Sequence, residues 1–185
     1  MAGTRRVAND PGRRERILDA ALDVIAGHGV HKTTHRRIAE RAQVPLGSLT
    51  YYFDGLEAIF EQAFARLSEL MSQRYRDRLA AARDAGEACE VVTDLICGPD
   101  YAGSREVVLL FEMYSYANHN PAVADIARQW LFRSRDALER HFPPRACRAI
   151  DALVEGWPMH EVFERAPLER AAVLATVTAI AEHVS

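Results

Sequence analysis

Apolar residues recur three and four positions apart along almost the whole chain, and this spacing limits the folds open to it. The first such stripe comprises Ile17, Ala20-Ala21 and Val24-Ile25, which one face of an α-helix brings together. Sustained alternation of apolar and polar residues, the pattern of a half-buried β-strand, does not occur. The sequence therefore predicts an all-α protein with about nine helices.

Glycine and proline mark the expected ends of these helices. A polar arm over residues 1–12 precedes three short helical segments over residues 13–55, which Gly29 and Pro45 separate. Longer helical segments follow over residues 56–185. Proline suits the first turn of a helix, because the N–H that it lacks has no partner there. We therefore expect two folded domains after the arm, over residues 13–55 and 56–185.

The composition is that of an ordinary globular protein, with 49% apolar and 26% charged residues. No apolar run approaches the roughly 18 residues that a membrane span needs, and the start of the chain lacks the apolar segment of a signal peptide. The three cysteines have no spacing typical of a zinc site. We expect a cytoplasmic protein with no membrane partner, no metal and no cofactor.

The three short segments, with a tight turn between the second and third, are typical of a helix-turn-helix. The recognition helix of such a unit enters the major groove of DNA with its N-terminal residues toward the bases. Residues 45–51 would form it. Leu46 could then contact a thymine methyl group, Gly47 would allow close approach, and Ser48 could hydrogen-bond a base or a phosphate.

The distribution of charge agrees with a DNA partner. Residues 1–54 hold nine basic and six acidic residues, whereas residues 55–185 hold fourteen and twenty. A positive first third can meet a polyanion. Arg36 and Arg37 precede the recognition helix, so one could reach guanine while the other meets a phosphate. From charge alone, a solvated basic face explains these arginines equally well.

The segment from Arg13 to about residue 65 resembles the N-terminal domain of the TetR family of bacterial transcriptional regulators. That family pattern sets alanines, a glycine, threonines, basic residues and aromatic residues at defined spacings. The positions that match it here are Ala20-Ala21, Gly29, Thr33-Thr34, Arg36-Arg37, Ile38-Ala39, Val44, Gly47, Leu49, Tyr51-Tyr52 and Phe53.

The resemblance implies roles for individual residues. The aromatic pair Tyr51-Tyr52 would end the recognition helix and contact backbone phosphates, with Phe53 anchoring the small core. Thr34 would cap the second helix and offer its N–H to a phosphate. The residues expected to contact DNA are Thr34, Arg36, Arg37, Leu46, Gly47, Ser48, Thr50, Tyr51 and Tyr52.

Three positions depart from the family pattern. Thr50 stands where a tyrosine is usual, Leu56 where a lysine is common, and Gln43 where the turn usually has glycine. Because two phosphate contacts are weakened or lost, we expect Tyr51-Tyr52 to contribute more than usual to binding of the DNA backbone. The arm residues Arg5-Arg6 could compensate through the neighbouring minor groove.

For the remainder of the chain, the resemblance implies a helical regulatory domain that binds a small molecule and dimerises through its last two helices. Apolar stripes on the last two segments fit a four-helix bundle between two chains. Packing inside the same chain could account for one apolar face of each helix. The residues expected at the dimer interface are Ile150, Leu153, Val154, Val173, Val177, Ile180 and Val184.

Aromatic and apolar residues of the central segments could line a pocket with a few polar groups. Plain core packing is the alternative explanation for each of them. The residues expected to line the pocket are Leu110, Phe111, Tyr114, Trp130, Trp157 and His160.

Motifs of catalysis are missing. The stretch His160–Glu164 lacks the second histidine of a zinc protease motif, and neither a glycine-rich phosphate loop nor a nucleophile elbow occurs. We therefore expect no catalytic residues and no enzyme. The function expected is a ligand-responsive homodimeric transcriptional regulator, most simply a repressor that a small molecule releases from a palindromic operator in double-stranded DNA. The alternative is a helical small-molecule-binding or catalytic protein whose helix-turn-helix is only structural.

Overall fold

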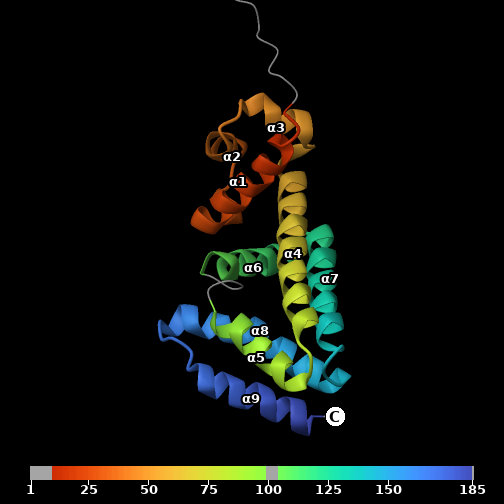
Figure 1. Ribbon diagram of the computed structural model, residues 1–185. Helices are drawn as coiled ribbons and strands as arrows, with labels where there is room; N and C mark the ends of the chain where they lie inside the picture. The colour runs from red at the N-terminus through yellow and green to blue at the C-terminus, as the bar shows by residue number, and fades with distance from the viewer. Residues whose placement is uncertain (1–9, 99–103, 185) are drawn as a thin grey trace, which may run out of the picture. The chain divides into compact units, whose positions relative to one another are not determined.

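The computed structural model describes residues 10–98 and 104–184. Over these residues it contains nine α-helices, one short 3-10 helix and no strand, which confirms the all-α class and the expected number of helices. The helices are α1 (Arg13–His28), α2 (His35–Ala42), α3 (Leu46–Tyr52), α4 (Gly55–Ala81), α5 (Ala85–Cys97), α6 (Ser104–Ala117), α7 (Pro121–Leu138), α8 (Pro144–Glu164) and α9 (Arg170–His183), with the 3-10 helix η1 (Val30–Lys32) after α1 (Figure 1).

The chain forms two compact units, one up to Phe64 and the other from Ala65 onward. The boundary falls inside α4, so this helix contributes to both units. In the first unit α1 packs against α2, and α2 packs against α3. Its largest buried side chains are Ile17, Ile25, Ile38, Leu49, Ile59 and Phe64.

Caps and turns explain where the short helices begin and end. Thr34 caps α2 as expected, because its Oγ1 accepts the N–H of Arg37 at 3.3 Å. Gly29 ends α1 with φ 78°, a conformation that glycine adopts without steric cost. Gln43 ends α2 with φ 54° and ψ 46°, so a residue with a Cβ adopts the left-handed conformation at the position where the family pattern implies glycine.

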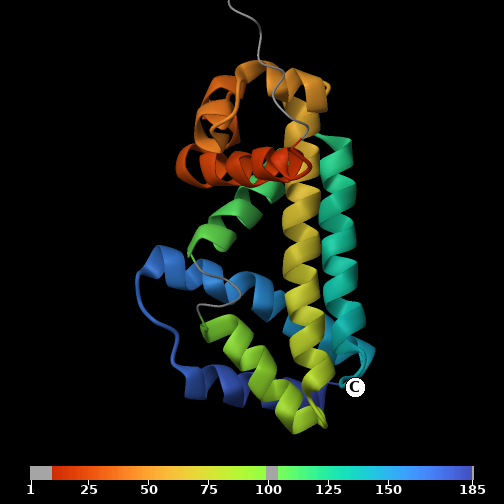
Figure 2. The same cartoon turned by 45° about the horizontal axis from the view of Figure 1, so that its top comes forward.

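The second unit consists of the C-terminal part of α4 together with α5 to α9. Within it α6 packs against α7, α7 against α8, and α5 against both α8 and α9 (Figure 2). The pair Asn120-Pro121 predicts an N-cap followed by proline in the first turn of α7. The structure confirms this, since Oδ1 of Asn120 accepts the N–H of Val123 at 3.0 Å. The largest buried side chains of this unit are Trp130, Tyr75, Met71, Leu79, Leu95 and Ile96.

Some helix ends differ from those expected. The sequence predicts that Pro167 starts the last helix, but α9 begins three residues later at Arg170, and residues 165–169 are not helical. Helix α8 runs through Pro158 to Glu164. Most of the expected N-terminal arm, including Arg5-Arg6, lies outside the described residues. None of the helices in the described part of the chain has the length and hydropathy needed to cross a membrane.

Candidate nucleic-acid interface and ligand cavity

Helix α3 is held by two apolar anchors and otherwise faces outward. Leu49 is fully buried and Phe53 is 4% exposed, as the expected inward role of Phe53 requires. By contrast Leu46 is 53% and Tyr51 80% exposed. An isolated large apolar side chain at the surface is not unusual, but an exposed leucine and an exposed tyrosine on one seven-residue helix indicate a contact surface.

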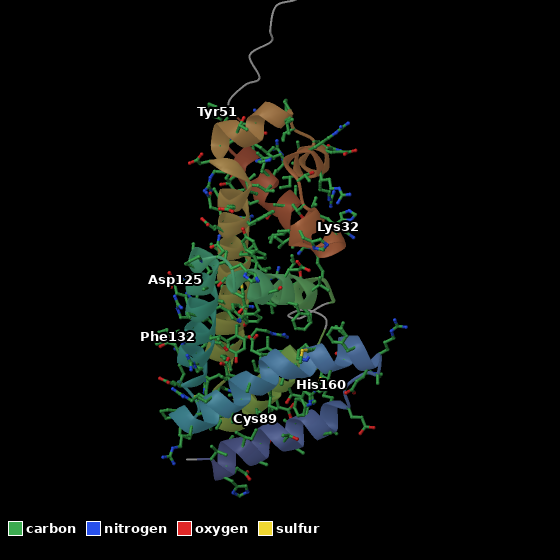
Figure 3. The ribbon with its side chains drawn as sticks, turned by 180° about the vertical axis from the view of Figure 1, so that it is seen from behind. Lys32, Tyr51, Cys89, Asp125, Phe132 and His160 are labelled. Atoms are coloured by element: carbon green, nitrogen blue, oxygen red, sulfur yellow. The ribbon has the colours of Figure 1, made fainter. Side chains whose placement is uncertain are left out.

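The tyrosine pair divides between the surface and the core of the first unit. The rings of Tyr51 and Tyr52 meet edge to face, with centroids 4.9 Å apart and planes at 89°. Tyr52 is half-buried and lies 6.5 Å from the ring of Phe53. Tyr51 lies on α3 and is 80% exposed (Figure 3). Tyr52 therefore supports Tyr51, and both keep surface that a ligand can reach.

Arg36 and Arg37 of α2 differ in whether their side chains are held by a hydrogen bond within the protein. Arg37 donates from its guanidinium to the carbonyl oxygen of Lys32 at 2.8 Å. Arg36 is exposed and forms no hydrogen bond or ion pair with any residue in the described part of the chain. One arginine is thus held against the loop that precedes α2, while the other is free to reach an external partner.

Two further polar contacts bear on this surface. The hydroxyl of Thr50 donates to the carbonyl oxygen of Gly47 at 3.2 Å, which leaves its lone pairs available as acceptors. Arg14 lies 5.6 Å from the ring centroid of Phe53 and also bonds to Gln62. The contacts of Arg14 with Phe53 and Gln62 were not predicted from the sequence, because these residues are far apart along the chain.

The second unit contains a narrow cavity between α6 and α8, with a volume of about 20 Å³, room for about one water molecule, and it opens partly to solvent. Three residues expected in a pocket line it, namely Leu110, Phe111 and Tyr114. The full lining is Val107, Leu110, Phe111, Tyr114, Val154, Glu155 and Pro158.

Glu155 is the charged residue in this lining, and sequence reasoning missed it. Its Oε2 accepts the hydroxyl of Tyr114 at 2.7 Å, and its Oε1 accepts the indole N–H of Trp130 at 2.7 Å. The residue is half-buried, but protein surrounds its carboxylate. This burial raises the pKa of Glu155, and the two hydrogen bonds partly counter the rise. A signal was present, since Asp151 and Glu155 fall one turn apart within an apolar stretch.

Trp130, Trp157 and His160 do not line the cavity, which corrects the expected pocket. Trp130 is 1% exposed and contributes through its hydrogen bond to Glu155. Trp157 follows Glu155 by two positions, which on an α-helix turns it by about 200°. His160, on α8 in Figure 3, is exposed, and its Nδ1 lies 3.0 Å from Oε1 of Glu164.

The expected dimer stripe also needs correction. Ile150, Val154, Val173 and Val177 are at most 3% exposed within a single chain, so they cannot form a surface for a second chain. For α9 the cause is its packing against α5 and α8, to which Arg170 adds ion pairs with Glu90 and Asp94. Leu153, Ile180 and Val184 are half-buried. Packing within the chain therefore accounts for the inner faces of both helices.

Comparisons with known proteins agree with this arrangement. The family model described as "Bacterial regulatory proteins, tetR family" matches residues 17–63. SCO7518 from Streptomyces coelicolor A3(2), described as a transcriptional regulator, has a solved structure with 42% identity and a TM-score of 0.83, and the match covers 93% of this chain and 99% of that one.

Two further similarities extend over most of the chain. The multidrug binding protein EbrR, solved with imidazole, is 28% identical with a TM-score of 0.74, over 95% of this chain and 98% of that one. The transcriptional regulator BetI 1 of Chromohalobacter salexigens is 24% identical over 160 residues, which are 82% of this chain and 79% of that protein. The helix-turn-helix surface, the helical second unit and these similarities together show that the chain belongs to the TetR family of bacterial transcriptional regulators.

Proposed function

We propose that this regulator is a homodimeric repressor that leaves a palindromic operator when a small molecule enters the cavity of its second unit. The observation that carries the proposal is the outward face of α3, where the buried Leu49 and Phe53 present Leu46 and Tyr51 to the outside. In this proposal the protein acts on DNA in the bacterial cytoplasm and has no catalytic role.

The DNA contacts divide into base readers and phosphate binders. Leu46, Gly47 and Ser48 begin α3 and would face base edges, since recognition helices read bases through their N-terminal residues. Tyr51-Tyr52 would hydrogen-bond phosphates from the end of that helix. The free guanidinium of Arg36 suits a guanine or a phosphate, because a bidentate donor fits either. Thr34, Arg37 and Thr50 would add phosphate contacts.

Dimerisation follows from the small size of this surface. One short recognition helix reads few bases, so specific binding needs a second copy related by a twofold axis. The proposed interface uses the outward faces of α8 and α9, since the inner faces are buried in the chain. On α9 these outward residues are small: Ala172, Ala175 and Ala179 are exposed at helical spacing. Small side chains allow close approach of two helices.

A cavity ligand would act through α4. This helix belongs to both units, so it links the regulatory unit covalently and without a loop to the DNA-binding unit. A shift of α4 would change the separation of the two recognition helices in the dimer, which must match major grooves about 34 Å apart. A coupling free energy of about 1–3 kcal/mol would weaken operator binding roughly 5- to 150-fold.

Small-molecule binding is supported by EbrR, which has been solved with imidazole, ethidium, proflavin and malachite green. A chain with this fold can therefore bind such compounds. The ligand of the present chain is expected to contact Leu110, Phe111 and Tyr114, which line the cavity.

Selection of bound sequences from random DNA, with ligand-free purified protein, tests the proposal. We expect a palindromic consensus whose half-sites are about one helical turn apart or a multiple of it. Enrichment of no sequence would overturn the DNA-binding proposal and favour a helix-turn-helix that is only structural. Enrichment of a single half-site would retain DNA binding and reject the dimer.

A further inference from the structure

Glu155 places a carboxylate in the cavity wall with no basic partner. Its two hydrogen-bond donors, Tyr114 and Trp130, are neutral groups. Within the described residues, no arginine, lysine or histidine forms an ion pair with it. Burial of a carboxylate costs free energy unless an opposite charge compensates. The carboxylate of Glu155 therefore lacks a counter-charge among the described residues, although both of its oxygens accept hydrogen bonds.

Asp151 strengthens this local negative potential. It lies one turn before Glu155 on α8, is 7% exposed, and its Oδ1 has no hydrogen-bond partner among the described residues. Arg135 influences Asp151 electrostatically, but its Nε donates to the backbone carbonyl of Leu131. Two buried carboxyl groups one turn apart disfavour the binding of an anion here and favour the binding of a cation.

The rest of the cavity wall is apolar and aromatic. Phe111 and Tyr114 lie on α6 opposite Val154 and Pro158 of α8. The ring of Phe111 also stacks on that of Phe163, with centroids 6.0 Å apart and planes at 28°. Aromatic faces attract cations, most strongly where water is excluded. A small inorganic ion would gain little from such walls, whereas an organic cation would bury apolar surface against them.

We propose that the cavity binds a lipophilic organic cation, for which Glu155 is the counter-charge and Phe111 and Tyr114 supply aromatic contacts. This inference rests on the proposed function, since it names the ligand class of the same cavity. A neutral ligand would leave the Glu155 carboxylate without a counter-charge. The cavity is narrow, so a ligand of dye size requires its side chains to move apart.

The position of Glu155 also connects such a ligand to regulation. Its carboxylate accepts one hydrogen bond from α6 and one from α7, while the residue itself belongs to α8. A cation that draws the carboxylate toward the cavity competes with Tyr114 and Trp130 for its oxygens. Binding would thus change the contacts that join three helices of the regulatory unit.

Calorimetric titration with a matched pair of probes tests the proposal. Tetraphenylphosphonium is a lipophilic cation, and triphenylphosphine oxide is a neutral compound of similar shape. We expect the wild-type protein to bind the cation at least about tenfold more tightly than the neutral compound. Glu155→Gln should weaken binding of the cation about tenfold or more and leave the neutral compound within about twofold.

Glu164→Gln is the matched control. It removes the same charge from the same helix, but Glu164 is exposed and does not line the cavity. Its binding of the cation should remain within about twofold of wild type, because solvent screens exposed charges. Thermal unfolding of both variants checks that they fold. Should Glu155→Gln fail to fold, the preference of the wild-type protein for the cation still tests the inference.

Three results would overturn the inference. They are equal affinity of the wild-type protein for both probes, no measurable binding of the cation, and unchanged binding of the cation by a folded Glu155→Gln variant. None of them touches the DNA-binding proposal, which the selection experiment tests separately. If a neutral compound releases the operator and tetraphenylphosphonium does not, the repressor proposal stands and the ligand class is wrong.

Discussion

At the scale of single residues, the candidate DNA surface depends on which side chains the local fold leaves free. Arg36 and Arg37 are neighbours in sequence, yet one is exposed without a partner in the described chain and the other is held by Lys32. The sequence alone did not show which of the two arginines is free to contact DNA. That depends on the hydrogen bond from Arg37 to a backbone carbonyl, which the geometry of the segment before α2 determines.

Arg36→Ala should weaken operator binding about tenfold or more at fixed salt, since it removes a bidentate cationic contact. A phosphate contact would lower the log–log salt slope by about one unit, and a base contact would relax the consensus at one position. Fluorescence anisotropy with a labelled operator measures both. Arg74→Ala removes the same charge from an exposed site on α4 and should change affinity by less than about twofold.

Tyr51→Phe should weaken operator binding by roughly 0.5–1.5 kcal/mol, because it removes one hydroxyl and keeps the ring. The same anisotropy assay measures the change. Protein stability should not move, since Tyr51 is 80% exposed. An unchanged affinity would remove Tyr51 from the phosphate contacts, and with an unchanged Arg36→Ala it would favour a purely structural helix-turn-helix.

Gln43→Gly should stabilise the protein by roughly 0.5–1 kcal/mol, because Gln43 has φ 54° and only glycine adopts that conformation without a Cβ penalty. Denaturant unfolding measures the gain. The control is Gln129→Gly, an exposed position within α7, where glycine should cost about 1 kcal/mol. An equal loss of unfolding free energy in both variants would mean that glycine does not stabilise the turn at position 43.

At the scale of helices, α8 combines a buried apolar row with an adjacent row of acids. The apolar row was readable from the sequence. Asp151 and Glu155 were not recognised, because an acid beside an apolar stripe more often lies at the solvent edge of the helix. Only the packing of α6 and α7 against α8 determines that Glu155 meets Tyr114 and Trp130.

Glu155→Gln should be stabilised relative to wild type as the pH rises. Burial raises the folded-state pKa of Glu155 above its usual 4.5, so the folded state binds this proton more tightly than the unfolded state. The stability linked to that proton is fully present below pH 4.5 and is lost as the pH rises through the folded-state pKa. Urea unfolding at several pH values should show a growing advantage of the variant. A difference independent of pH would contradict it.

The outer and inner faces of α9 should respond differently to substitution. Ala175→Arg places a charge on the exposed face and should shift the dimer toward monomer without loss of the fold. Val173→Ala removes buried methyl groups and should cost roughly 1.5 kcal/mol of unfolding free energy. Sedimentation velocity and denaturant unfolding separate the two effects. A monomer from Val173→Ala, together with an intact dimer from Ala175→Arg, would reverse the proposed assignment of faces.

At the scale of the whole molecule, sequence reasoning succeeded where information was local. Helical class, capping by Thr34 and Asn120, and the inward position of Phe53 all depend on residues a few positions apart. The inner faces of α8 and α9 were misread as a dimer interface, because periodicity shows that a face is apolar and does not show what covers it. Contacts such as Arg170 with Glu90 join residues far apart in sequence and needed the folded chain.

The continuity of α4 constrains how the protein can be recombined with its relatives. A DNA-binding fragment that ends at Gly55 would lack Ile59 and Phe64, which are buried in the first unit. A chimaera that places this unit on another regulator must therefore join the two chains inside the helix, beyond Phe64. One residue inserted there would rotate everything that follows by about 100° and move it by 1.5 Å. The number of residues in α4 thus determines how the segments before and after the junction are rotated relative to each other.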